Sequence, residues 1–309
     1  MSDARLGEHL AVVREQSTRR DGRAWLATLP ALIDAAVKRW DLTLGEPFTG
    51  GSAAWVAPVR CGGEDVVLKI TLPHREAQDE GAGLRLWGGE GAVQLVAASE
   101  DGFSLLIERC RPGTNLWDER CSTEEQLTFG ATLLARLWGH AVPTDAPFDT
   151  VDDVCREWAE HVRMRNEASP VRLDDALVET GARLLETLPT TASRRVLVHG
   201  DFNPGNILRA ERYPWLAIDP KPMVGDPGYD PYPLAAQLGF VDSEPPNRKT
   251  IRRNYEVVAD IVGEPLERLL AWGAARSVES ALWHTSLDEP EKALDMMDWA
   301  RAFADLGGA

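Results

Sequence analysis

The spacing of hydrophobic and polar positions separates a helical beginning of the chain from a strand-rich segment that follows it. Residues 5–19 and 30–40 place apolar side chains at helical spacing, so each segment predicts an amphipathic helix. Between residues 41 and 71, short runs of alternating apolar positions are separated by glycine pairs at 50–51 and 62–63. Alternation broken by glycine turns predicts antiparallel strands.

Helical spacing returns at residues 74–87, and two strand-like runs follow it at 92–99 and 103–110. Asp101 and Gly102 lie between these runs and form a favourable hairpin turn. The Arg-Pro-Gly sequence at 111–113 then interrupts the pattern, and we expect the boundary between two domains there.

After residue 122 the pattern is mostly helical, with one interruption by short strands at 207–208 and 215–218. The predicted helices cover residues 123–140, 150–167, 173–188, 247–262, 266–286 and 290–305. We therefore expect an α+β fold in which a small antiparallel-sheet domain, residues 1–110, precedes a larger helical domain, residues 111–309.

Charge narrows the range of partners. The 309-residue chain has 33 basic and 49 acidic residues, which gives a net charge of −16. A negative field repels phosphate backbones, so we expect no nucleic-acid partner, and it attracts a small cationic molecule. Acidity also serves solubility alone, which is the plainer interpretation of the charge.

The remaining composition indicates a cytoplasmic protein. The N-terminal residues lack the basic and apolar regions of a secretory signal, and no apolar run is long enough to cross a bilayer, so no membrane partner is expected. The four cysteines lack the spacing of zinc ligands, and we expect free thiols.

One segment of the helical domain, LVHGDFNPGNILRAERYPWLAIDPKP at 197–222, concentrates polar side chains at the ends of short apolar runs. Asp201 follows His-Gly after the first run, Asn206 precedes the second, and Asp219 ends the third. Turn chemistry explains residues 203–205, Asn-Pro-Gly, but it does not explain the two carboxylates. Carboxylate and carboxamide oxygens at one edge of a strand pair suit a hard cation such as Mg²⁺.

The spacing H-x-D-x-x-x-x-N followed by a strand-terminal Asp resembles the protein-kinase catalytic loop and its metal-binding Asp. With glycine after the histidine, HGDFNPGN resembles the aminoglycoside phosphotransferase family, which implies a bilobal protein-kinase-like fold. The resemblance implies that Asp201 accepts the proton of the substrate hydroxyl, that Asn206 and Asp219 hold Mg²⁺, and that His199 orients the loop. Residues 220–221 are Pro-Lys instead of Phe-Gly, which favours a small-molecule kinase over a protein kinase.

A further segment, GDPGYDPYPLAAQ at 225–237, contains Asp226 and Asp230 in a turn that enters a helix. Helix capping and turn chemistry explain both residues. The resemblance implies that Asp226 supports the catalytic loop structurally. Together with the preceding AIDPKPMV, this segment is similar to the streptomycin 6-kinase and hydroxyurea kinase group of the family, and the similarity covers residues 45–240.

A kinase of this family requires a phosphate-binding lysine in its first domain, and Lys69 ends the apolar run at 66–68. A lysine in this position is otherwise a solvated strand residue. Glu80 shares a helical face with Leu84 and Trp87, so it should point inward and pair with Lys69. Glu76, one turn earlier on the same face, is the alternative partner, and the resemblance favours Glu80.

Two other segments are assigned to the nucleotide by resemblance. The loop at 49–54 is glycine-rich, and the backbone of Gly51 and the hydroxyl of Ser52 would contact phosphates, although the loop alone is an ordinary hairpin turn. Main-chain atoms near Glu108 and Cys110 would bind the adenine.

The resemblance implies an ATP-dependent enzyme, with GTP as an alternative donor, that acts as a monomer or homodimer on a small cationic or polar hydroxyl-bearing substrate. Acidic residues of the helical domain and Trp158, Trp272, Trp283 and Trp299 suit an amine- or guanidinium-bearing acceptor such as streptomycin. Each Trp equally suits a place in the core. Hydroxyurea, an endogenous metabolite and a role as a nucleotide-binding pseudokinase are the alternatives.

Overall fold

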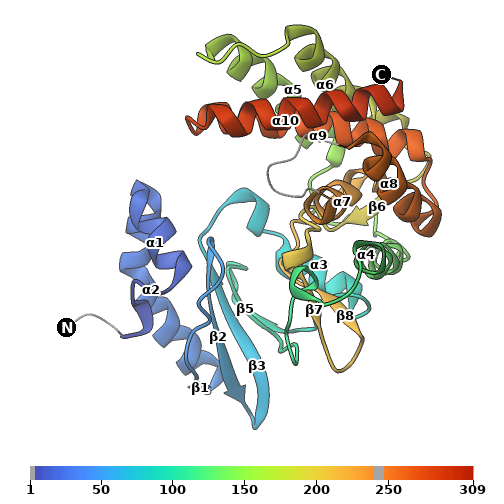
Figure 1. Ribbon diagram of the computed structural model, residues 1–309. Helices are drawn as coiled ribbons and strands as arrows, with labels where there is room; N and C mark the ends of the chain where they lie inside the picture. The colour runs from blue at the N-terminus through green and yellow to red at the C-terminus, as the bar shows by residue number, and fades with distance from the viewer. Residues whose placement is uncertain (1–3, 240–246, 309) are drawn as a thin grey trace. The chain divides into compact units, whose positions relative to one another are not determined.

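The computed structural model describes residues 4–239 and 247–308. The chain divides into two compact units, which are described separately below (Figure 1). Unit 1 comprises Met1–Gly113 and Ala210–Arg212, and unit 2 comprises Thr114–Arg209 and Tyr213–Ala309. The boundary after Gly113 falls at the Arg-Pro-Gly sequence, and the short insertion at 210–212 was not expected from the sequence.

Unit 1 is an antiparallel sheet of five strands in the order β1-β2-β3-β5-β4, with helices before it and within it. Its helices are α1 (Ala11–Thr18), α2 (Arg20–Trp40) and α3 (Glu80–Trp87), with 3₁₀ turns at Ala4–Leu6 and Arg75–Ala77. Its strands are β1 (Leu42–Leu44), β2 (Ala54–Cys61), β3 (Glu64–Thr71), β4 (Leu95–Ala98) and β5 (Ser104–Glu108). This sheet confirms the predicted antiparallel strands.

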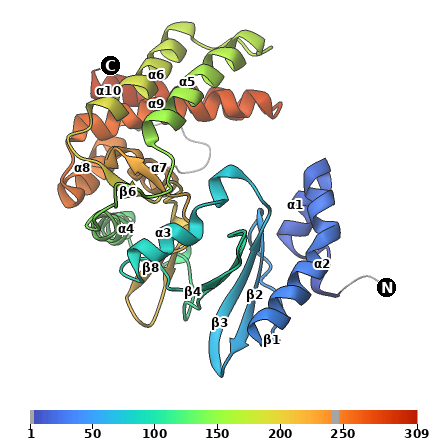
Figure 2. The ribbon, with the colours of Figure 1, turned by 180° about the vertical axis from the view of Figure 1, so that it is seen from behind.

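Alternation along the strands creates a core on one face of the sheet. Trp55 lies opposite Ile70, and Ala57 lies opposite Leu68, so these side chains share a face. They are buried in one cluster with apolar residues of α1 and α2, such as Ile33. Figures 1 and 2 show α1 and α2 lying beside this sheet.

The prediction of a second helix at residues 30–40 was wrong about where this helix begins. Helix α2 starts at Arg20 and continues through Pro30. Trp25, Leu29 and Ile33 are buried on one side of α2, so a single apolar stripe passes across the proline. The burial of that stripe outweighs the backbone hydrogen bond that proline cannot donate.

Unit 2 is mostly helical. Its α-helices are α4 (Thr123–Leu137), α5 (Val151–Ala168), α6 (Asp175–Thr187), α7 (Pro231–Gly239), α8 (Arg248–Val262), α9 (Leu266–Ser286) and α10 (Pro290–Gly307). It also has 3₁₀ turns at Leu116–Asp118, Pro189–Thr191, Pro204–Asn206 and Pro227–Tyr229. The α+β class expected from the sequence is confirmed by this combination of sheet and helices.

Helix α9 packs against α5, α6 and α10, and these four helices form one group (Figure 2). Trp272 of α9 and Trp299 of α10 are buried in this core. None of the helices in the described part of the chain has the length and apolar character that crossing a membrane requires.

Two small antiparallel sheets in unit 2 support the loop that follows His199. Strand β6 (Val196–Val198) pairs with β9 (Met223–Gly225), and β7 (Ile207–Arg209) pairs with β8 (Trp215–Ala217). The β7–β8 pair was predicted, whereas β9 was not. Because the chain passes from β6 through the loop into β7, both ends of the loop are held by strands.

The contact between α6 and α9 generates a stability prediction. A Cβ atom at Gly181 would lie 2.6 Å from Cβ of Val278. Alanine favours a helix by about 1 kcal/mol over glycine, but overpacking a core costs about 1–3 kcal/mol. We expect Gly181→Ala to lower the free energy of unfolding, as measured by urea denaturation.

Gly307→Ala provides the matched control. It also replaces a helical glycine, but the nearest atom, Cβ of Leu270, lies at an ordinary contact distance of 3.5 Å. We expect this variant to be as stable as the wild type or more so. Equal effects of the two substitutions would contradict the close packing of α6 on α9.

Candidate active site

His199 follows strand β6 and is completely buried. Its Nε2 lies 3.0 Å from the carbonyl oxygen of Ile218, and its Nδ1 lies 3.3 Å from the backbone nitrogen of Asp201. The carbonyl can only accept and the amide can only donate, so the ring is the neutral tautomer with its proton on Nε2. Burial lowers the pKa of His199 to about 4, against the opposing effect of the Asp201 and Asp219 charges. His199 therefore holds two segments together as an uncharged ring.

Asp230, in the turn before α7, supports the same loop. Its carboxylate accepts hydrogen bonds from the backbone N–H groups of His199 (2.7 Å) and Gly200 (2.8 Å) and from Nε1 of Trp138 (3.1 Å). Burial raises the pKa of Asp230 to about 6, although these three bonds favour the charged form. This contact was not predicted, because the bond from His199 joins residues 31 positions apart and no local pattern signals it.

Gly200 has a φ of +83°, a conformation that favours glycine. A Cβ atom there would lie only 2.0 Å from the carbonyl oxygen of Lys221. The backbone N–H of Lys221 donates to the carbonyl of His199 at 2.7 Å. Glycine is therefore required between His199 and Asp201 because the segment after β8 passes directly against the loop.

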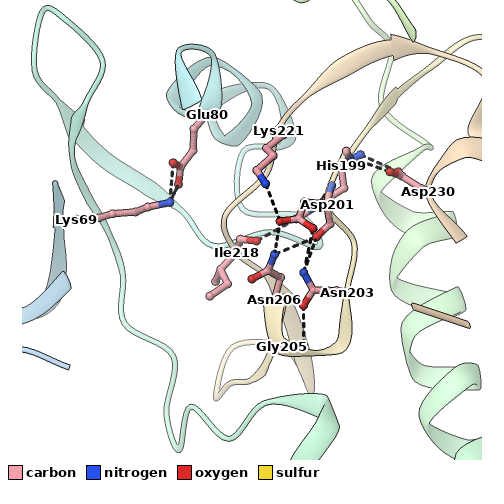
Figure 3. Close-up of polar contacts among 11 residues, drawn as sticks. Lys69, Glu80, His199, Asp201, Asn203, Gly205, Asn206, Ile218, Lys221 and Asp230 are labelled. Carbon is pink, nitrogen blue, oxygen red and sulfur yellow. Dashed lines mark hydrogen bonds and ion pairs between the residues drawn. The ribbon is translucent and has the colours of Figure 1, made fainter. Parts of the chain in front are cut away.

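Asp201 lies at the centre of a hydrogen-bond network, drawn in Figure 3. Its Oδ1 accepts from Nδ2 of Asn203 at 3.0 Å, and its Oδ2 lies 3.0 Å from Nζ of Lys221 and 3.3 Å from Nδ2 of Asn206. Burial would raise the pKa of Asp201, but Lys221 and Asn203 together hold it below its usual value. Asp201 is thus an oriented carboxylate that stays charged at neutral pH. The ion pair with Lys221 was not predicted.

Asn206 and Asp219 are brought close by the pairing of β7 with β8. The carbonyl of Asn206 accepts the N–H of Ile218 at 2.9 Å, one residue before Asp219. The Asn206 side chain faces two acceptors of Asp201, its carbonyl oxygen (3.0 Å) and Oδ2 (3.3 Å), so the amide nitrogen must point at Asp201. The Oδ1 atom of Asn206 then points away from Asp201 as an available oxygen ligand.

Asp219 has a φ of +56°, in the left-handed region that non-glycine residues rarely adopt. Such conformations are often found at functional sites. The donor set of a carboxylate and a carboxamide fits Mg²⁺, which prefers a few protein oxygens and completes its shell with water and phosphate. No cluster of three or more His, Cys, Asp and Glu side chains suited to a metal occurs within residues 4–239 and 247–308.

In unit 1, the structure brings Lys69 and Glu80 together. Nζ of Lys69 lies 2.7 Å from both carboxylate oxygens of Glu80, and the side chains are 6% and 2% exposed (Figure 3). Lys69 lies on β3 and Glu80 begins α3, whereas Glu76 is exposed. The helical register predicted an inward glutamate and left Glu76 as the alternative, and the resemblance favoured Glu80, which is the residue that pairs with Lys69.

The glycine-rich loop of unit 1 is supported by α1. Gly51 has a φ of +89°, and Ser52 is exposed. The carbonyl of Ser52 accepts from Nε2 of Gln16 at 2.7 Å, and the carbonyl of Thr49 accepts the N–H of Ala11 at 3.0 Å. Gln16 is a buried polar residue in an amphipathic helix, and no role was predicted for it.

Of the two residues predicted to lie by the adenine, Glu108 ends β5 and Cys110 lies two residues after it. The Glu108 carboxylate pairs with Arg212 at 2.7 Å, inside unit 1. The backbone N–H of Glu108 donates to the carbonyl of Gln94 at 2.8 Å, so this donor is already used. Burial, with a smaller effect of the Glu108 charge, raises the pKa of Cys110 to about 12, so its thiol stays protonated at neutral pH.

Asp226 is completely buried, but its partners differ from those of Asp230. It bonds to Arg268 (3.0 Å to Nε), to Nε1 of Trp272 (2.7 Å) and to the N–H of Gly228 (2.9 Å). These contacts attach the turn before α7 to α9. Among the described residues, the carboxylate that bonds directly to the backbone of the His199 loop belongs to Asp230, so any support from Asp226 is indirect.

The four tryptophans considered as pocket walls divide into two pairs. Trp272 and Trp299 fill the core, whereas Trp283 is 46% exposed and Trp158 is half-buried. Trp158 lies over the guanidinium of Arg276 at 4.8 Å, and Trp283 over that of Arg165 at 5.1 Å.

The sequence of this chain matches one protein family and several of its members over most of its length. The profile of a family described as aminoglycoside/hydroxyurea antibiotic resistance kinase matches residues 39–287. A streptomycin 6-kinase from Streptomyces glaucescens is 32% identical over 93% of this chain and 92% of its own length. A hydroxyurea phosphotransferase from Kitasatospora aureofaciens is 32% identical over 93% of this chain and 82% of its own.

A solved structure shares the fold. A spectinomycin phosphotransferase in complex with ADP and spectinomycin matches with a TM-score of 0.60, at 14% identity, over 89% of this chain and 98% of that protein. The similarity confirms the kinase-like α+β fold predicted from the sequence.

The environment of Asp230 yields a prediction. In Asp230→Asn, one backbone N–H of the loop would face the amide NH₂ instead of an oxygen, and an unsatisfied buried donor costs about 1–3 kcal/mol. We expect a lower free energy of unfolding and slower turnover at neutral pH.

The stability deficit of Asp230→Asn should depend on pH. Since the pKa of Asp230 is raised from 3.8 to about 6 by burial, the unfolded chain loses this proton first. The contribution of Asp230 to stability therefore decreases as pH rises through this interval, while asparagine does not titrate. Urea denaturation should show a smaller deficit at pH 7 than at pH 5. The exposed Asp145→Asn is the control, and a deficit that grows with pH would contradict the prediction.

Proposed function

The chain belongs to the aminoglycoside/hydroxyurea antibiotic resistance kinase family, and from this membership we propose that it transfers the γ-phosphoryl group of ATP to a hydroxyl group of an aminoglycoside such as streptomycin. The observation that carries the proposal is the environment of Asp201. This carboxylate is oriented by Asn203, Asn206 and Lys221 on a loop that is fixed from both ends.

In the proposed reaction, Asp201 orients the acceptor hydroxyl and takes its proton. Oδ1 of Asp201 accepts one bond from Asn203, so a second lone pair on this oxygen suits the hydroxyl. As the hydroxyl oxygen bonds to the γ-phosphorus, the bond between that phosphorus and the bridging oxygen breaks, and its electron pair leaves with ADP. The proton ends on Asp201. Phosphoryl transfer depends on such positioning more than on a strong base, which suits a carboxylate of lowered pKa.

Asn206 and Asp219 are the residues proposed to hold Mg²⁺. When bound, Mg²⁺ would neutralise charge on the nucleotide phosphates. Oδ1 of Asn206 is directed away from Asp201, and the neutral His199 lies between the chain segments that carry Asp201 and Asp219. An uncharged ring there adds no positive charge that would compete with a metal cation.

Lys69, oriented by Glu80, is proposed to bind the nucleotide phosphates, and Gly51 and Ser52 to cover them. A buried ion pair with two 2.7 Å contacts holds the ammonium in a single position. The spectinomycin phosphotransferase was solved with ADP, which supports an adenine nucleotide as donor, with GTP as the alternative. Backbone atoms near Glu108 and Cys110 are proposed to contact the base.

The acceptor is proposed from the relatives more than from the acidic side chains. Several of the acids considered for a cationic acceptor form ion pairs: Asp152 with Arg195, Asp153 with Arg156 and Glu289 with Lys292, each at 2.8 Å. Because these acids are already paired with basic side chains, they give little support to a site for a cationic acceptor. Streptomycin 6-kinases from Streptomyces glaucescens and Streptomyces griseus, 32% and 33% identical, support an aminoglycoside.

Hydroxyurea is the second candidate acceptor. The hydroxyurea phosphotransferase is as similar to this chain, at 32% identity over 93% of it, as the streptomycin 6-kinase from Streptomyces glaucescens. Hydroxyurea also carries a hydroxyl group, so the same loop chemistry would apply to it.

A screen of acceptors tests the proposed function. The wild-type chain with Mg²⁺ and ATP is incubated with streptomycin, spectinomycin, hydroxyurea and glucose, and ADP formation and product mass are measured. We expect streptomycin to gain one phosphoryl group. Turnover of hydroxyurea alone would favour the second candidate, and turnover of none of the acceptors would contradict the proposal.

Variants of the two carboxylates separate the proposed base from the proposed metal ligand. Asp201→Asn keeps the shape of the side chain but not its basicity, so kcat should fall by about 10²–10⁴ while Mg–ATP affinity stays near that of the wild type. Asp219→Ala should instead abolish the dependence of ATP binding on Mg²⁺, as measured by titration calorimetry. Full turnover in the first variant, or unchanged Mg–ATP binding in the second, would remove that residue from its role.

A further inference from the structure

Lys221 is attached to the catalytic loop by both its backbone and its side chain. Its N–H donates to the carbonyl of His199 at 2.7 Å, and its Nζ lies 3.0 Å from Oδ2 of Asp201. The Lys221 and Asp201 side chains are 33% and 29% exposed, so the pair is open to solvent on one side. Figure 3 shows the side chain directed at Asp201.

The position of Lys221 is fixed by the backbone. The carbonyl of Lys221 lies so close to Gly200 that a Cβ atom there would approach it to 2.0 Å, and strands β8 and β9 flank the segment. A surface lysine that meets a carboxylate by chance has no such constraint. The fold therefore positions the ammonium group of Lys221 beside the Asp201 carboxylate.

With Asp201 as the proposed base, this charge lies beside the carboxylate that the acceptor hydroxyl would contact. Oδ2 of Asp201 is taken by Lys221 and Asn206, whereas Oδ1 has one bond from Asn203. A hydroxyl on Oδ1 would be on the same carboxylate as Lys221, and the phosphorus it attacks would lie within a few ångströms of the ammonium group.

A cation solves an electrostatic problem at this position. The transferred group is an anion, and it must approach a site that already holds the carboxylates of Asp201 and Asp219, both close enough to act on His199. Like charges in a partly desolvated site repel each other strongly. An ammonium group held beside the base would offset part of that repulsion in addition to Mg²⁺, and charge stabilisation is a main source of catalysis in phosphoryl transfer.

We propose that Lys221 is a further catalytic residue of the transfer, which rests on the function proposed above: its ammonium group contacts the γ-phosphoryl oxygens while it is paired with Asp201. Lys221 takes no proton and forms no covalent bond in the step. The bond changes remain those between the acceptor oxygen, the γ-phosphorus and ADP, with the proton passing to Asp201. The rival role is purely positional, in which Lys221 only holds the Asp201 carboxylate.

Nucleotide binding distinguishes these roles without any acceptor. Titration calorimetry compares Mg–ADP with the Mg complex of a non-hydrolysable ATP analogue that has an NH bridge between its β- and γ-phosphates. A charge-assisted contact to the γ-phosphate predicts that Lys221→Met and Lys221→Gln weaken binding of the analogue by about tenfold or more. Both variants should leave the affinity for Mg–ADP nearly unchanged. Lys221→Arg, which keeps the charge, should retain most of the analogue's affinity.

The same comparison in an Asp201→Asn background tests whether Lys221 acts through Asp201. Direct contact predicts that Lys221→Met still weakens the analogue selectively in that background. A positional role predicts no further loss. Lys292→Met, which removes an equal charge from the exposed ion pair with Glu289, is the control and should leave both affinities unchanged.

Catalysis supplies a second measurement. Lys221→Met should reduce kcat far more than it raises KM for the acceptor, and Lys221→Arg should restore much of kcat. Thermal unfolding verifies that each variant is folded, and the partial exposure of the side chain predicts little change in Tm. The proposal would be overturned if folded Lys221 variants lost equal affinity for Mg–ADP and for the analogue, or lost affinity for neither.

The proposed function and the role of Lys221 fail in different experiments. The function fails if the wild-type chain phosphorylates no acceptor in the screen. The assignment of Lys221 is decided by the difference between two nucleotides, which requires binding alone.

Discussion

The geometry of the candidate active site depends on one buried carboxylate. Asp230 receives two consecutive backbone N–H groups, those of His199 and Gly200, and an indole N–H from α4's end at Trp138. Burying a carboxylate is costly, and the raised pKa of Asp230 records that cost. The cost of burying this carboxylate is offset only when all three N–H donors are in place, so one backbone conformation of the loop between β6 and β7 is favoured. Asp201 comes directly after Gly200, so the orientation of its side chain depends on the backbone that Asp230 holds at His199 and Gly200.

The two small sheets complete this arrangement from the other side. Pairing of β7 with β8 sets Asn206 beside Ile218 and Asp219, and pairing of β6 with β9 closes the segment in which Lys221 lies. His199 connects the two, because its ring accepts from the Asp201 amide and donates to the Ile218 carbonyl. Three strand-end segments that are separated in the sequence are therefore fixed against one another by short hydrogen bonds, and the polar side chains they carry need little reorganisation to react.

Local patterns predicted some of this structure and could not predict the rest. The fold class followed from strand alternation and helical spacing. The partner of Lys69 followed from the register of Glu80 with Leu84 and Trp87 together with the family resemblance, which favoured Glu80 over Glu76. These signals extend over a few residues. The start of α2 was missed because tertiary burial of its apolar stripe overrides Pro30, which local propensity treats as a boundary. The contacts of Asp230 with Gly200, of Lys221 with Asp201 and of Gln16 with Ser52 join residues 20 to 36 positions apart, and no short pattern encodes them. The roles of Asp201, Asn206 and Asp219 remain proposals that their geometry supports.

The bond between Gln16 and Ser52 has a consequence for dissecting the protein. The family profile begins at residue 39, whereas the helices that support the glycine-rich loop and cover the sheet occupy residues 11–40. A shortened chain that kept only the matched residues would expose Trp55, Leu68 and Ile70 to water and release the loop at Thr49 and Ser52. The smallest autonomous folding unit is thus larger than the segment matched by the family profile. Truncation limits for expression or crystallisation should be chosen from the packing of α1 and α2 and not from the ends of the match.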